Sequence, residues 1–270
     1  MNAATENLAS LVERAYQVFD DERPSSLLVC TACCMDASHA DHMLTLQPCD
    51  LDLRDVESWL SAAWSADAVE SRHVVRWIMP RILELLIHGE LLSYCGHFKL
   101  SRLRDTGFPQ AYNLEEANLL RDFAMKFVAT FVDCPESLNR ECDLDDSLIM
   151  FAAANIDMVP ILDRLDACPD SSLVERIVEC VGRDDHSVYL DPKVYITRRQ
   201  LCGSRSSFET IHRWYTSDEM LQRMLTYAEG SSGTLSQRQI AWETAEAILA
   251  ISSADVCNDS RFACVGRPWR

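Results

Sequence analysis

Hydrophobic positions recur with a helical period along most of the chain. Apolar residues spaced three or four apart mark one face of a helix, whereas a half-buried strand shows strict alternation. Alternation over five or more residues occurs only weakly, at 188–196. The helical spacing predicts helices over residues 8–19, 37–46, 53–64, 70–88, 113–131, 143–154, 157–167, 173–181, 221–228 and 240–249.

This pattern predicts an all-α fold, and local signals refine it. Asn113 followed by Glu116 three residues later is typical of a capped helix start. Pro80 lies inside the 70–88 segment, which predicts either one helix or a kinked pair. Because the apolar stripe around Pro80 is unusually wide, we expect this segment at the centre of the core. An irregular multi-helix bundle is favoured over a HEAT-like array of helix pairs.

The least helical stretch suggests a division of the chain. Residues 183–196 are expected to form a loop or a short extended piece, and they are the candidate hinge. The predicted units are an N-terminal helical bundle over 1–182 and a smaller C-terminal part over 197–252, although the two also fit one continuous domain. Beyond them, 253–270 is expected to be a tail.

Charge changes the picture of what the chain can bind. It has 25 Lys and Arg against 42 Asp and Glu, so the formal net charge is −17. Nucleic-acid binding requires a basic surface, so no nucleic-acid partner is expected. An anionic membrane is disfavoured for the same reason, and no apolar run approaches the ~18 residues needed to cross one. Residues 1–50 carry eight acids against two arginines, which predicts a basic protein partner for the N-terminal half.

The cysteines and the N-terminal residues indicate a cellular location. Twelve cysteines are spread through helical segments of the 270-residue chain, unlike the dense framework of a short secreted protein. The first residues lack a basic region followed by an apolar one, so secretion is not expected. The cytoplasm is therefore the predicted location.

One local cluster has the residue types of a metal site. Cys30, Cys33 and Cys34 form a Cys-x-x-Cys-Cys element. A tetrahedral zinc ion requires four ligands, and a Cys-x-x-Cys element brings two thiolates to one point. Nearby side chains are the candidates for the remaining ligands. The candidate ligands are Cys30, Cys33, Cys34, His39, His42 and Cys49. The sequence suggests no cofactor other than zinc at this cluster. Adjacent side chains such as Cys33 and Cys34 rarely both reach one ion.

Two other interpretations of the same cluster stay open. In the structural one, Asp36 is the N-cap of the helix over 37–46, the cysteines pack the preceding turn, and the histidines are exposed. In the thiol-redox one, Cys33 or Cys34 lies just before a helix N-terminus, which lowers a thiol pKa. No βαβ pattern surrounds the element, so a thioredoxin-like assignment has no support.

The remaining candidates for chemistry are weak. The chain has no Gly-x-Ser-x-Gly elbow and no glycine-rich phosphate loop. His186 after two aspartates is the only catalytic-looking histidine outside the cluster, and Asp143–Asp146 lacks the glycine and glutamate of a calcium loop. No catalytic residue is predicted. These observations favour a non-enzymatic, acidic helical scaffold that binds another protein. An immunity protein that masks a basic toxin is one version of this hypothesis.

Two segments carry a resemblance to other proteins. They read Cys30-Thr31-Ala32-Cys33-Cys34-Met35-Asp36 and Ile78-Met79-Pro80-Arg81-Ile82-Leu83-Glu84-Leu85-Leu86-Ile87-His88-Gly89. In both, the chain resembles a group of uncharacterised bacterial proteins that are helical throughout. The resemblance covers residues 25–165 and extends loosely to about 250. It implies a helical fold and supplies no activity.

Overall fold

Helices make up most of the chain that the structure describes. The computed structural model describes residues 3–20, 22–64, 68–90, 100–133, 144–184 and 205–253. Its elements are α1 (Ala3–Val18), α2 (Ala37–Met43), the 3-10 turn η1 (Pro48–Asp50), α3 (Leu53–Ser61), α4 (Ala68–Ile87), α5 (Ser101–Asp105), α6 (Leu114–Asp133), α7 (Leu144–Ala153), α8 (Val159–Asp166), α9 (Asp170–Asp184), α11 (Arg205–Tyr215), α12 (Asp218–Glu229) and α13 (Leu235–Ser253). Within those ranges the only extended pairing is an isolated antiparallel bridge between Val29 and Trp64. The predicted all-α, multi-helix fold is confirmed.

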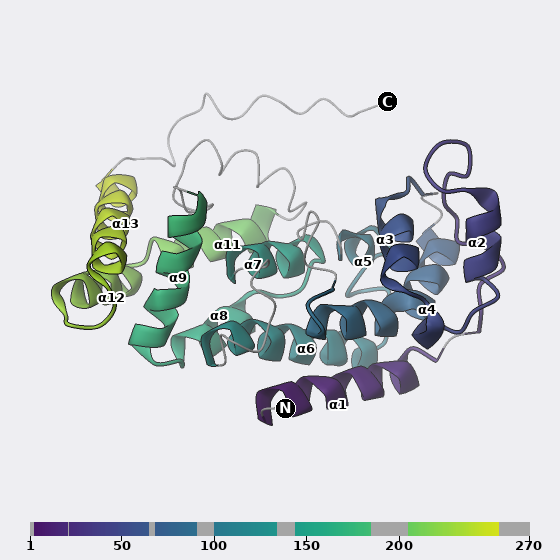
Figure 1. Ribbon diagram of the computed structural model, residues 1–270, viewed down its shortest axis with the longest axis horizontal. Coiled ribbons are helices and arrows are strands. Elements are labelled where there is room, and N and C mark those ends of the chain that lie inside the picture. Colours follow the sequence, from purple (N-terminus) through teal and green to yellow (C-terminus); the bar gives the residue numbers. More distant parts are fainter. Residues whose placement is uncertain are drawn as a thin grey trace.

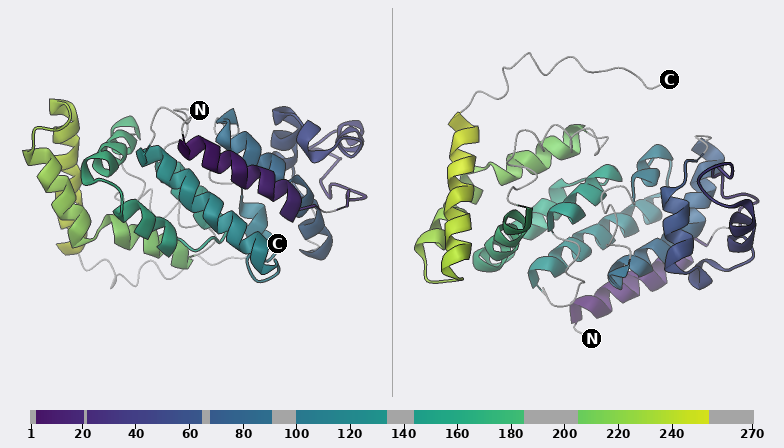
Figure 2. Two further views of the ribbon diagram at one scale, coloured as in Figure 1. Left: turned by 90° about the horizontal axis from the view of Figure 1, so that it is seen from below. Right: turned by 45° about the horizontal axis from the view of Figure 1, so that its top comes forward.

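The helices form an elongated array. Figure 1 shows α2 and α3 at one end of the molecule and α12 and α13 at the other. Helix α6 runs between them and packs against α1, α7, α8 and α9. Seen from below, α1 lies alongside α6 (Figure 2). The position of α6 follows from its sequence, because its apolar face is wide enough to meet neighbours on several sides.

Four phenylalanines form an aromatic cluster within the core. Phe127 has no exposed surface, and its ring stacks on that of Phe123 with centroids 5.6 Å apart. The rings of Phe131 and Phe151 meet Phe127 edge-on, at 5.6 and 5.8 Å. Such offset and edge-to-face pairs contribute beyond the area they bury. One continuous hydrophobic cluster extends from Leu8 in α1 to Ile248 in α13.

The predicted start of the helix after Asn113 is confirmed. The Glu116 backbone N–H donates to Asn113 Oδ1 at 2.9 Å, and the Asn113 N–H donates to Glu116 Oε2 at 2.8 Å. The Glu116 side chain is fully buried and forms an ion pair with Arg76 of α4 at 2.6 Å. The cap of α6 therefore also joins two neighbouring helices, which the sequence spacing did not indicate.

Other boundaries differ in detail from the prediction. The segment around Pro80 is one helix, α4, and it is buried on most sides as expected. Helix α2 ends at Met43 and not at 46, and Leu46 packs half-buried after the helix. Helix α5 was not predicted, because five residues are too few to show a helical period.

The C-terminal helices pack onto the rest of the molecule. Helices α12 and α13 contact each other and α9, and α11 contacts α7 and α8. Residues 185–204 lie outside the described residues, and they include most of the predicted hinge and His186. Residue 143, at the start of a predicted helix, and residues 254–270, in the predicted tail, also lie outside them. The division into two units therefore stays a prediction. In the described ranges, no helix combines the length and hydropathy of a membrane-spanning segment.

Candidate metal centre

The cysteine element lies on a tight turn between α1 and α2. Leu27 and Met35, on either side of it, are buried and anchor the turn to the core. The Cys30 N–H donates to the Ala63 carbonyl at 2.6 Å, beside the Val29–Trp64 bridge. The Cys30 carbonyl then accepts from the N–H groups of Cys34 and Met35, at 3.3 and 3.1 Å. These bonds fold the chain back on itself after Cys30.

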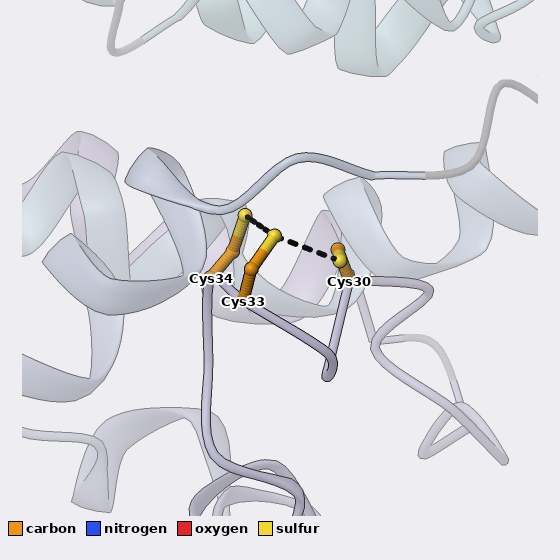
Figure 3. Close-up of side chains that lie close together, drawn as sticks. All are labelled: Cys30, Cys33 and Cys34. Carbon is orange, nitrogen blue, oxygen red and sulfur yellow. Dashed lines mark hydrogen bonds between the residues drawn. The ribbon is translucent and has the colours of Figure 1, made fainter.

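The turn brings three sulfur atoms together. Cys33 Sγ lies 3.5 Å from Cys30 Sγ and 3.5 Å from Cys34 Sγ, as Figure 3 shows. All three sulfurs lie within 4.8 Å of one another. Cys33 and Cys34 are exposed and Cys30 is half-buried. Adjacent side chains seldom converge, but here the turn directs both Cys33 and Cys34 toward Cys30.

This spacing suits one thiophilic metal ion. A zinc ion with Zn–S bonds of about 2.3 Å holds tetrahedral sulfur ligands about 3.8 Å apart. The sulfur–sulfur separations here differ from that value by about 1 Å or less, which side-chain rotation accommodates. The three cysteines can therefore hold a metal ion through three bonds. A fourth position would open to solvent, because Cys33 and Cys34 are exposed.

The other three predicted ligands do not join the cysteines. Within the described ranges, the group of potential ligand atoms that converges contains Cys30, Cys33 and Cys34 alone. The ring of His39 bonds instead to Asp55 of α3, with Nε2 2.8 Å from Oδ1. His42 is exposed near the end of α2. Cys49 is exposed on η1 beside a cleft of about 410 Å³.

Hydrogen bonds shift the pKa values of Cys30 and Cys33 in opposite directions. The Cys33 S–H, followed by the backbone N–H groups of Ala32 and Cys33, lowers the pKa of Cys30 below that of a free thiol. The same bond to Cys30, together with one to Cys34, raises the pKa of Cys33 to about 11. Cys30 is therefore ionised before Cys33. This order also suits thiol-redox chemistry, which stays a prediction.

The structural interpretation is correct for the helix but not for the cysteines. Asp36 is the N-cap of α2, accepting from the Ser38 N–H at 2.8 Å. Bonds from the Ser38 hydroxyl and backbone lower the pKa of Asp36. Met43 is fully buried, as predicted. However, the sulfurs of Cys33 and Cys34 face solvent and do not pack the turn.

A buried arginine is connected to the cysteine turn through Trp59. Arg102 of α5 is 5% exposed and donates to the carbonyls of Trp59 and Ala62 at 2.5 and 2.6 Å. Its guanidinium lies 4.0 Å from the ring centre of Trp59 and 4.7 Å from that of Trp64. The indole N–H of Trp59 in turn donates to the Leu27 carbonyl at 3.3 Å. Burial lowers the pKa of Arg102 to about 10. No sequence signal identified this residue, because α5 itself was not predicted.

Comparison of the chain with protein-family models, with curated proteins and with solved structures returned no match. The resemblance to bacterial helical proteins therefore stays a prediction.

The role of His39 can be tested directly. Replacing His39 with alanine removes its bond to Asp55 and is expected to lower the free energy of unfolding by about 1 kcal/mol, measured by urea denaturation. Metal affinity should stay unchanged in a cobalt titration, because His39 is not in the converging group. A tenfold or greater loss of affinity would instead show that His39 takes part in metal binding, either as a ligand or as a partner of one.

Proposed function

We propose that this protein binds one thiophilic metal ion, with zinc as the first candidate, through the thiolates of Cys30, Cys33 and Cys34. The observation that carries the proposal is the convergence of the three sulfurs, two pairs at 3.5 Å and all within 4.8 Å. Thiolates are soft ligands that favour zinc and copper(I) over hard cations such as magnesium and calcium.

The surroundings of the site argue for an exchangeable ion. Structural zinc sites have four protein ligands, whereas three ligands leave a position for water or another molecule. The turn is also held by the burial of Leu27 and Met35 and by the backbone bond from Cys30 to Ala63, and none of these contacts uses a cysteine sulfur. We therefore infer that the metal is carried on a folded scaffold and is not required for folding, in contrast to a zinc finger.

The test is a metal titration of the reduced, chelator-treated chain. We expect about one zinc per chain, and cobalt(II) should give the intense near-ultraviolet thiolate-to-metal absorption of a multi-thiolate site. Helical circular dichroism should not change between the metal-free and loaded forms. Less than about 0.2 zinc per chain would exclude the proposal.

Two exposed cysteines provide a matched pair of variants. Cys33→Ser removes the central sulfur of the cluster and is expected to weaken zinc binding by about 100-fold or more, measured by competition with a chromogenic chelator. Cys49→Ser makes the same chemical change outside the cluster and should leave affinity unchanged. Equal effects in the two variants would contradict the assignment of the site.

A second candidate function is binding of a basic protein, as an immunity protein would do. It is favoured by the exposure of most acids in the N-terminal part of the chain. The exposed acids are Glu13, Asp20, Glu22, Asp36, Asp41, Asp50 and Asp52. Such a surface attracts a basic partner and speeds its association.

This candidate requires a comparison of two charge-neutralised variants. In the first variant, Asp20, Glu22 and Asp50 are replaced by the corresponding amides. In the control variant, the exposed residues Glu229 and Glu243 are replaced by glutamine. Affinity purification from the native host should recover a basic protein in about equimolar amount with wild type and the control, but not with the first variant. Recovery of no stoichiometric partner would count against this function.

A further inference from the structure

Helix α13 lies at one end of the molecule (Figure 2), and it presents large apolar side chains to solvent. Leu235, Trp242 and Leu249 are 79%, 42% and 49% exposed. They are seven residues apart, which is close to two helical turns, so they lie on one side of α13. An adjoining side of the helix, about 100–120° around from Trp242, is occupied, because Ala241 and Ile248 are buried where α13 packs on α12 and α9.

The exposed side also carries one charge of each sign. Arg238 lies four residues before Trp242, and Glu246 lies four residues after it. With Leu235 and Leu249 they form a stripe with spacings of three, four, four and three residues, all within about a quarter of the helix circumference. We call these five residues the α13 stripe. Glu246 is exposed and Arg238 is half-buried.

The α13 stripe is self-complementary about Trp242. At seven residues from Trp242 there is a leucine on either side, and at four residues there is an arginine on one side and a glutamate on the other. A two-fold interface requires this property, because residue i must fit residue j of the second copy while j fits i.

We propose that α13 pairs antiparallel with α13 of a second copy of this chain, with a two-fold axis at Trp242. Leu235 then packs on Leu249 of the second copy, and Arg238 faces Glu246 of the second copy, each contact occurring twice. A parallel pairing would place Arg238 against Arg238 and Glu246 against Glu246, so the charges select the antiparallel orientation.

The present bonds of the two charged residues are compatible with this pairing. One terminal nitrogen of Arg238 donates to the Gly230 carbonyl at 2.9 Å, which leaves the other for Glu246 of the second copy. Glu246 accepts from the Trp242 indole at 3.2 Å through one oxygen. A single helix face buries less area than a standard interface of about 1,600 Å², so we expect a weak dimer with a Kd in the micromolar range.

The experiment exploits the symmetry of the stripe. Sedimentation of the full chain from about 1 to 300 μM should show a reversible dimer for wild type. Arg238→Glu places two glutamates against each other at both contacts, and Glu246→Arg does the same with arginines. Each variant alone should dimerise at least about tenfold more weakly. An equimolar mixture of the two should form a heterodimer, because every contact then joins opposite charges.

Controls separate pairing from folding. Glu243→Arg makes the same charge change on an exposed residue of α13 outside the stripe and should dimerise like wild type. Thermal melts by circular dichroism establish that all variants are folded. A wild type that stays monomeric throughout the concentration range overturns the proposal. So does a mixture that fails to form heterodimers when wild type dimerises. Chelator in the buffer makes the result independent of metal binding.

Discussion

Replacing Arg102 with alanine is expected to lower the free energy of unfolding by at least about 3 kcal/mol. The guanidinium is almost fully buried and donates to the carbonyls of Trp59 and Ala62. A hydrogen bond to a charged group contributes about 1.5–3 kcal/mol, and a desolvated cation–π contact such as that with Trp59 about 2 kcal/mol. The cost of burying the charge offsets part of this sum. Alanine removes the charged donor from both carbonyls, and the Trp59 carbonyl keeps only the 3.3 Å bond from the Ala62 N–H.

Urea denaturation followed by circular dichroism measures this loss. Arg104→Ala is the matched control, because Arg104 lies on the same short helix and pairs with Asp105 near the surface. Its expected cost is at most about 1 kcal/mol. If Arg102→Ala and Arg104→Ala cost the same, the buried guanidinium does not stabilise the end of α3.

Phe127→Ala is expected to cost about 3–5 kcal/mol, the usual range for a phenylalanine removed from a packed core. Its ring has no exposed surface and contacts the rings of Phe123, Phe131 and Phe151. The loss includes the buried apolar area and the cavity that the surrounding helices fill only in part.

The control for this variant lies on the same helix. Leu114, the first residue of α6, is 76% exposed, and Leu114→Ala should change stability by no more than about 0.5 kcal/mol. Urea denaturation measures both losses. If the two variants unfold with the same m-value, the difference between their denaturation midpoints gives the difference in stability. A loss below about 1.5 kcal/mol for Phe127→Ala would mean that the site collapses and refills.

Features that depend on neighbouring residues were predictable from the sequence. The caps at Asn113 and Asp36 each join groups two or three residues apart, so their residue types alone identify them. The same holds for the long helices, whose apolar period repeats over several turns.

The candidate site was predictable only in part, because its geometry depends on distant contacts. The Cys-x-x-Cys-Cys element marked three ligands, but their convergence depends on the bond from Cys30 to Ala63, 33 positions later. His39 had suitable spacing for a ligand, but Asp55 of another helix binds it. In α13, the apolar pattern did not distinguish Trp242, which is exposed, from Ile248, which is buried.

The packing of α1 has a consequence for biosynthesis. Its apolar face, which includes Leu8, Leu11 and Phe19, is covered mainly by α4 and α6. Helix α6 begins at Leu114, so at about 5–20 residues per second it is made roughly 5–20 s after α1. During that interval the nascent chain exposes an amphipathic helix that lacks its final neighbour. The ribosome-bound protein thus offers chaperones a hydrophobic surface that the finished molecule hides.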